Sequence, residues 1–236
     1  MSLKTDILTQ LKRRGTLSGQ ALAEMFGVTR AAVWKAVFAL RKEGYRIEGA
    51  PKAGYRLLPS DVADGDELSR LLSEAGFPGV KIYVVSALPS TNAYAERLLA
   101  EGETAPSLVL AERQTAGRAR RGKAFPSETG GVYMSLLLFP RAPAREADAL
   151  SEKIYGAVRS VLGGTLRDNE IFSDGTKLCG MLVEYLSDPD GIRSCIAGVG
   201  VYPQYLPPAA RERFPTRVSL CAALSAAILS ALSAPL

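Results

Sequence analysis

The sequence predicts a protein of the α/β (α+β) class with a small N-terminal helix-turn-helix unit and a larger domain of strands and helices. Residues 1–58 combine helical spacing of apolar residues with an excess of cationic ones. Residues 59–66 are polar and contain proline, glycine and aspartate, which is typical of a linker. From there on, apolar runs of strand length alternate with helical stretches. We therefore predict two domains, residues 1–60 and residues 67–236.

The composition is that of an ordinary globular protein, with 236 residues of which 47% are hydrophobic and 22% charged. No apolar run reaches the roughly eighteen residues of a membrane helix, so we expect no membrane partner. Three widely spaced cysteines favour reduced thiols and a cytoplasmic location over a disulfide framework. Histidine is absent, which excludes Ser-His-Asp and Cys-His catalysis and argues against a transition-metal site. Any chemistry must therefore rely on positioning and fixed charge.

The net charge of +5 is unevenly distributed. Residues 1–58 hold eleven Lys and Arg against four Asp and Glu, whereas the remainder holds eighteen against twenty. A compact basic unit on a nearly neutral body indicates that nucleic acid binds at the N-terminal end.

The N-terminal unit is expected to contain three helices followed by a two-stranded wing. The predicted helices are residues 4–14, 19–26 and 30–43, and the wing strands are residues 45–48 and 54–58. Ser18 and Thr29 are placed to cap the second and third helices, with a tight turn at Gly27 between them. In the second helix we expect Leu22, Met25 and Phe26 to face inward.

Two short helices joined by a glycine turn, the second of them cationic, are typical of a unit that inserts its second helix into the major groove. Arg30 and Lys35 are the expected base or phosphate contacts, and Arg46, Lys52 and Arg56 are expected to reach operator DNA phosphates from the wing. The alternative is a small basic helical domain that docks on protein. The order of cap, turn, cationic helix and wing favours DNA.

The elements expected in the second domain follow from periodicity and from proline and glycine positions. The predicted helices are residues 67–75, 93–99, 145–162 and 218–232, and the predicted strands are residues 81–88, 107–111, 132–139, 177–184 and 193–201.

The segment between strands 107–111 and 132–139 carries five cations within eleven residues, where a short turn would suffice. Gly117 and Gly122 allow the backbone to turn and to approach a ligand closely. The cationic side chains suit carboxylate and phosphate oxygens; they include Arg118, Arg120, Arg121 and Lys123. A solvated basic loop without a ligand is the alternative.

Residues 112–125, which read ERQTAGRARRGKAF, resemble the ligand loop GRGRRGRxW of the biotin–protein ligases. Ala119 replaces its middle glycine and Phe125 replaces its tryptophan. Three further stretches occur in the order of that family: Ser90-Thr91-Asn92 after a strand, Val132-Tyr133-Met134-Ser135 in place of N-[LI]-Y-[LM]-S, and the run from Lys177 to Glu184 in place of KLAGILVE. The N-terminal unit resembles the type-11 helix-turn-helix of the bifunctional ligase/repressors in the same family.

The resemblance implies a mixed sheet with flanking helices in a biotin/lipoate ligase-like domain. It further implies a biotin site, with ATP as second substrate, Mg²⁺ bridging the phosphates, an acceptor protein and a homodimer on a palindromic site. The biotin-binding residues it implies are Ser90, Thr91, Asn92, Gln114, Gly117, Arg118, Ala119, Arg120, Lys177, Gly180 and Gly198. Those implied for catalysis are Arg118, Arg120 and Lys177, and those implied for the nucleotide are Arg121, Phe125 and Asn169. Read without the resemblance, Ser90 or Thr91 would cap a helix and Lys177 would extend from an apolar strand to solvent.

One stretch departs from the family pattern. Where the family has Lys-Trp-Pro-Asn-Asp, this chain has Leu166-Arg167-Asp168-Asn169-Glu170, so Leu166 replaces the lysine and Glu170 the aspartate. The connection before it, residues 163–165, looks too short for the usual strand, and the small C-terminal barrel of the family is expected to be missing. The resemblance implies that this stretch meets ATP and the adenylate. Without the lysine, stabilisation of the transition state for adenylation is expected to be weaker.

Two functional hypotheses follow. The first is an ATP-dependent biotin–protein ligase that also represses transcription in response to biotin. The second is a winged-helix regulator that binds biotin, biotinyl-AMP or a related ligand without turnover. A third reading, a protein-interaction module without any ligand, would require the whole biotin-side set to be coincidental.

Overall fold

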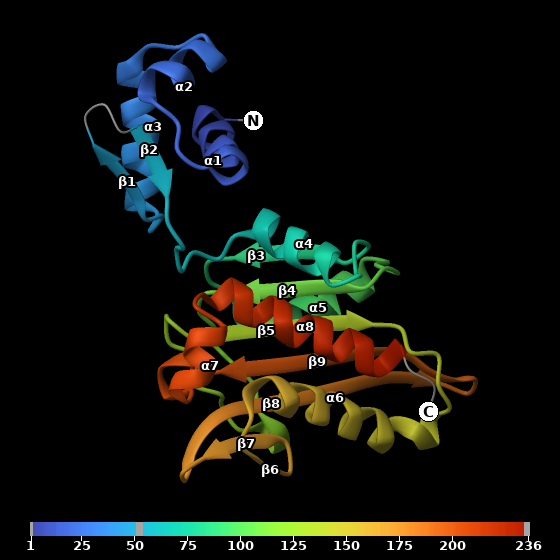
Figure 1. The fold of residues 1–236 in the computed structure, drawn as a ribbon. Coiled ribbons are helices and arrows are strands. Elements are labelled where there is room, and N and C mark those ends of the chain that lie inside the picture. Colours follow the sequence, from blue (N-terminus) through green and yellow to red (C-terminus); the bar gives the residue numbers. More distant parts are fainter. Residues whose placement is uncertain (1, 51–53, 234–236) are drawn as a thin grey trace. The chain divides into compact units, whose positions relative to one another are not determined.

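The computed structural model describes residues 2–50 and 54–233 (Figure 1). The chain divides into two compact units, Met1–Val62 and Ala63–Leu236. Within the described residues no helix has both the length and the apolar character needed to cross a membrane.

The first unit consists of three helices and a β-hairpin: α1 (Leu3–Arg14), α2 (Gly19–Phe26), α3 (Arg30–Lys42), β1 (Ile47–Ala50) and β2 (Gly54–Leu57). The side chains of Ser2, Ser18 and Thr29 cap the three helices, each by accepting a hydrogen bond from the backbone N–H three residues on. Gly27 ends α2 in the left-handed conformation, at φ 62°. The caps and the turn that the sequence predicts are thus present.

The core of this unit is built from one face of each helix and the hairpin. Its buried residues include Ile7, Leu11, Leu22, Val33, Val37, Leu40 and Ile47. Backbone hydrogen bonds between Leu17 and Tyr55, of 2.7 and 3.0 Å, tie β2 to the loop before α2. The expectation for Met25 is wrong, because its side chain is 38% exposed while Phe26 packs against the core.

The second unit begins with α4 (Gly65–Glu74), β3 (Lys81–Val85), α5 (Thr91–Ala100), β4 (Ser107–Ala111), η1 (Arg120–Gly122), β5 (Val132–Leu138), η2 (Ala144–Glu146) and α6 (Ala147–Leu162). It continues with β6 (Thr165–Arg167), β7 (Glu170–Ser173), β8 (Thr176–Asp188), β9 (Gly191–Val201), η3 (Pro203–Tyr205), α7 (Pro208–Arg213) and α8 (Arg217–Ser233). The strands form one sheet in the order β3-β4-β5-β9-β8-β7-β6. β3 and β4 are parallel and the other neighbours are antiparallel, so the expected mixed sheet is confirmed.

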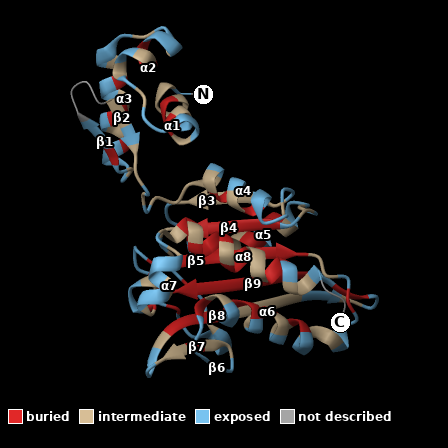
Figure 2. Ribbon diagram, viewed as in Figure 1, coloured by how far each residue is buried: buried red, intermediate tan, exposed pale blue. Residues whose placement is uncertain are grey.

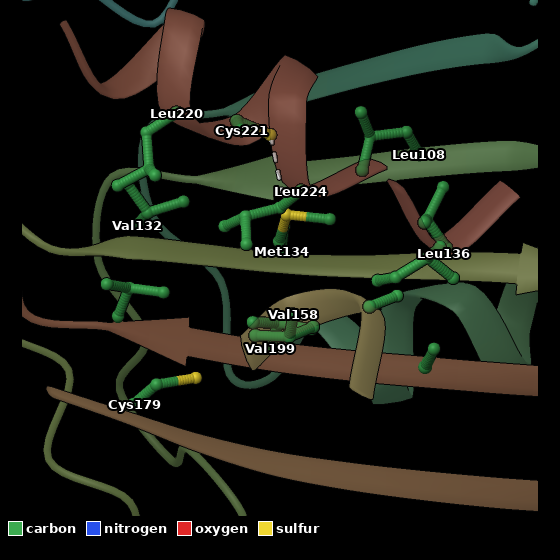
Figure 3. Packing of buried hydrophobic residues seen from close by; sticks show 14 of the residues in the cluster. Leu108, Val132, Met134, Leu136, Val158, Cys179, Val199, Leu220, Cys221 and Leu224 are labelled. Carbon is green, nitrogen blue, oxygen red and sulfur yellow. Dashed lines mark hydrogen bonds between the residues drawn. The ribbon is translucent and has the colours of Figure 1, made fainter. Parts of the chain in front are cut away.

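Alternating side chains divide the sheet between two layers of helix. On β4, Leu108 and Leu110 face the main core with α4, α6 and α8, whereas Val109 and Ala111 face α5. Figure 3 shows the main core, where Met134 of β5 lies beneath Cys221 and Leu224 of α8. The central strands β4, β5 and β9 are the most buried (Figure 2). The sheet therefore provides a packed floor on the α5 side, where Gly180 of β8 and Gly198 and Gly200 of β9 lie.

The stretch from Thr165 to Ser173 differs from expectation. It forms the antiparallel hairpin of β6 and β7, with Asp168 at φ 52° in the turn. Leu166 packs against the main core, which explains an apolar residue at this position. β6 has three residues, and Gly164 just before it lies at φ 83° against the Phe172 carbonyl, where a Cβ atom would come within 2.5 Å.

Candidate functional site

A cavity opens between the start of α5, the loop that follows β4, and strands β8 and β9. Its free volume is about 30 Å³. The residues that line it are Ser90, Thr91, Asn92, Gln114, Arg118, Ala119, Phe125, Asn169, Glu170, Lys177, Gly180, Met181, Leu182, Gly198, Val199 and Gly200. Segments more than one hundred residues apart in sequence thus meet in one place.

The first turn of α5 supplies buried polar groups. Ser90 caps the helix by accepting a hydrogen bond from the Ala93 N–H at 3.5 Å, so the capping role does hold for this residue. Thr91 donates from its N–H and from Oγ1 to Gln114 Oε1, at 2.8 and 3.1 Å. Gln114 in turn donates to Ser127 Oγ at 2.8 Å. The amide of Gln114 is therefore fixed from both ends.

Asn92 is held even more tightly. Its Nδ2 donates to Glu184 Oε2 at 2.7 Å and its Oδ1 accepts from Ser135 Oγ at 2.6 Å. A Cβ atom on Gly198 would lie 2.2 Å from Asn92 Oδ1. The glycine of β9 is thus required for this amide to reach the floor of the cavity.

Both cations at the cavity are paired with carboxylates. Arg118 Nη2 lies 2.7 Å from Glu96 Oε1 and 3.2 Å from Glu184 Oε2, and these neighbours, Glu96 foremost, raise the pKa of Arg118. Lys177 forms an ion pair with Glu170, and its ammonium lies 5.3 Å from the centre of the Phe125 ring. Lys177 is one of the residues that line the cavity, so its role in ligand binding stays a prediction. Three acidic partners, Glu96, Glu170 and Glu184, were given no such role by sequence reasoning.

An aromatic wall closes one side of the cavity. Phe125 is only 8% exposed and stacks on Tyr202 with ring centres 5.5 Å apart and planes at 9°. Cβ atoms on Gly180 and Gly200 would come within 2.7 and 2.3 Å of the Phe125 ring. Tyr202 is anchored by donating a hydrogen bond to the Pro126 carbonyl at 3.0 Å. The two glycines therefore make room for the ring.

Some of the expected site residues lie outside the cavity lining. Gly117 is buried behind it, where a Cβ atom would meet the Phe125 carbonyl at 2.4 Å. Arg120 and Arg121 are exposed on η1, the latter at φ 58°. Asn169 does line the cavity, but its side-chain amide donates a hydrogen bond to the Met181 carbonyl. The Met181 N–H donates in turn to the backbone carbonyl of Asn169 at 2.9 Å.

In the first unit, Arg30 and Lys35 are exposed on α3, and Arg46 and Arg56 are exposed at the wing. Lys52 lies outside the described residues. Among the residues that are described, no group of three or more His, Cys, Asp and Glu side chains is suited to hold a metal ion.

Comparison with known proteins agrees with this architecture. Residues 4–56 match the HTH domain family and residues 84–197 match the biotin/lipoate A/B protein ligase family. The chain is 33% identical over 214 residues to the bifunctional ligase/repressor BirA of Bacillus subtilis, covering 85% of this chain and 65% of that protein. It is 28% identical over 193 residues to BirA of Escherichia coli, covering 78% of this chain and 58% of that one. The chain thus spans less than two thirds of the length of these relatives.

Among solved structures, the biotin protein ligase of Leishmania major in complex with biotin superimposes with a TM-score of 0.50. It is 22% identical, and the match covers 66% of this chain and 75% of that one. This likeness supports the fold of the second unit.

Proposed function

The chain belongs to the biotin/lipoate A/B protein ligase family and carries an HTH domain in front of the ligase domain, and from this premise we propose that it is a biotin-responsive transcriptional repressor with biotin–[acetyl-CoA-carboxylase] ligase activity. Biotin would bind in the cavity of the second unit, and operator DNA would bind to the first unit.

The observation that carries the biotin site is the convergence of nearly all the biotin-side residues on one cavity. Thr91 and Asn92 are buried and Gln114 is half-buried, and all three offer fixed hydrogen-bonding groups, which suit a small uncharged polar ring such as the ureido group. At the other end, Lys177 and Arg118 are placed to meet a carboxylate. Since both cations are already paired with acidic residues, the ligand carboxylate would displace Glu170 from Lys177.

The proposed reaction has two steps. The biotin carboxylate oxygen attacks the α-phosphorus of ATP and pyrophosphate leaves. The amine of an acceptor lysine then attacks the carbonyl of the adenylate and AMP leaves. Arg118, Arg120 and Lys177 would stabilise negative charge near the phosphorus. Arg120 lies on an exposed turn, so it would have to move inward for this role. Mg²⁺ would arrive bound to the phosphates of ATP.

A regulator that binds biotin or its adenylate without turnover is the second candidate, and the hairpin of β6 and β7 favours it. Leu166 contributes to the core, and the guanidinium of Arg167 lies 5.5 Å from the centre of the Phe172 ring. Neither residue lines the cavity. The hairpin therefore offers no cation to a nucleotide at this wall, which weakens catalysis more than binding.

Biotin-dependent exchange of pyrophosphate into ATP separates the two candidates. Exchange by the full-length chain that is lost in Lys177→Ala supports the ligase. Saturable biotin binding with no exchange above the Lys177→Ala variant supports the binding-only regulator.

A further inference from the structure

The outward face of α3 carries a row of aromatic and cationic side chains. Residues four apart lie in one row on a helix, and here the row is Arg30, Trp34, Phe38 and Lys42. Trp34 is 53% exposed and Phe38 is 44% exposed. Their rings stack with centres 5.4 Å apart, and the Lys42 ammonium lies 4.9 Å from the centre of the Phe38 ring.

This row contributes nothing to the core of its own unit. Val33, Val37 and Leu40 fill that role from a different face of α3 and are 0–1% exposed. Two stacked aromatic rings left in water next to several cations indicate a binding surface. α3 contains no acidic residue, so the face favours a polyanion and disfavours a second copy of itself.

We propose that Trp34 and Phe38 read the 5-methyl groups of thymine in the major groove. This rests on the proposed DNA binding and deepens it by naming the bases that are read. In the major groove thymine presents a methyl group, which apolar and aromatic side chains recognise by contact. Neither ring offers a hydrogen-bond acceptor, and phenylalanine offers no donor, so hydrogen-bonded readout of base edges falls to Arg30 and Lys35.

The spacing of the two rings sets the expected spacing of the thymines. Four residues of helix rise about 6 Å at about 1.5 Å per residue. Base pairs are stacked about 3.4 Å apart. If α3 lies along the groove, its two rings contact methyl groups about two base pairs apart.

The test uses the full-length chain and the duplex that it enriches from a random-sequence pool. Each thymine of that duplex is replaced in turn by deoxyuridine, which keeps base pairing and removes only the methyl group. Affinities are measured by fluorescence anisotropy at one fixed salt concentration, because salt alone changes them strongly. At two positions the replacement should weaken binding by about fourfold, the factor expected for one buried methyl group.

Protein variants assign the effect to the two rings. In Trp34→Ala, deoxyuridine should no longer weaken binding at one of the two positions. In Phe38→Ala, it should no longer weaken binding at the other position. Lys35→Ala should weaken binding to every duplex while both uracil effects persist. Met25→Ala is the matched control, since Met25 is exposed on α2 outside the row and should leave the affinities unchanged. Thermal melting confirms that each variant is folded.

The possible failures are distinct. If no duplex is enriched, the proposed DNA binding fails. If a duplex is enriched but deoxyuridine has no effect at any position, or has the same effect in Trp34→Ala and Phe38→Ala, the thymine readout is wrong while DNA binding stands.

Discussion

The ring of Phe125 lies directly over Gly200, where a Cβ atom would come within 2.3 Å of the ring carbon Cε1. The ring is held from its other side by stacking on Tyr202. A loop residue and a strand glycine thus fit each other, and together they shape the wall of the cavity. Because Lys177 also lies close to this ring, a shift of Phe125 changes the surroundings of the cation.

Gly200→Ala is therefore expected to weaken biotin binding by roughly tenfold or more, since the added methyl group must push Phe125 out of its place. Isothermal titration calorimetry measures the change. Gly156→Ala in α6 is the matched control, because no atom lies within 4 Å of the added Cβ atom, and it should leave the affinity unaltered. Equal affinities for all three proteins would show that Phe125 is not part of the site.

Glu170→Gln should tighten biotin binding by about threefold. In the proposed binding mode Glu170 competes with the ligand carboxylate for Lys177, and the substitution removes this competitor. A partly exposed ion pair of this kind contributes up to about 1 kcal/mol. Lys177→Met, titrated under the same conditions, should instead weaken binding. Weaker binding by Glu170→Gln would mean that Glu170 contacts the ligand itself.

Glu103 makes the stability depend on pH in the acid range. Its carboxylate accepts hydrogen bonds from Lys81, the Ala105 and Thr104 N–H groups and Tyr83, which lower the pKa of Glu103 to about 2. The unfolded value is about 4.3. A pKa that is lower in the folded state stabilises the fold above pH 4.3, and this contribution is lost as the pH falls toward 2.

Urea unfolding of Glu103→Gln should accordingly show lower stability near neutral pH and a smaller loss of stability between about pH 4.5 and 2.5. Glu101→Gln is the control, because the Glu101 side chain is 62% exposed and an ion pair as exposed as its 3.6 Å pair with Arg97 contributes little. Parallel pH profiles for the wild type and Glu103→Gln would contradict the assignment.

The cysteines should be inert in the folded protein. All three are buried, and burial raises the pKa of Cys195 and Cys221 to about 12 and that of Cys179 as well. Because the thiolate is the reactive form, a thiol reagent near pH 8 should modify none of them in native protein and all of them in denaturant. Rapid modification of a native thiol would show that the core opens at that residue.

Removal of residues 1–60 should abolish DNA binding without changing biotin affinity, because the first unit has its own core. Electrophoretic retardation with the gene's own promoter tests the first part, and titration with biotin tests the second. Unaltered retardation by the truncated protein would place DNA binding in the second unit.

Local signals in the sequence account for the parts of the structure that were predicted correctly. Ser18 and Thr29 accept hydrogen bonds from N–H groups three residues away, so the caps of α2 and α3 can be predicted from the sequence. The segments around Ser90, Gln114 and Lys177 were located by motif, and the fold brings them to one cavity.

Contacts between distant segments could not be predicted in the same way. Glu184 is 66 residues from Arg118 and 92 from Asn92, and spacing along the chain does not encode such pairings. The hairpin of β6 and β7 was also missed, because its strands are short and its turn places Asp168, not a glycine, at positive φ. The exposure of Met25 depends on how α2 is rotated against α3, which the apolar pattern of a short helix leaves open.

The central claim is that the cavity between α5, the loop that follows β4, and the glycines of β8 and β9 binds biotin. Calorimetric titration of biotin into the full-length protein tests it most directly. We expect saturable one-to-one binding that Lys177→Ala weakens by roughly tenfold or more. The absence of any binding heat, together with an unchanged melting temperature in excess biotin, would contradict the claim.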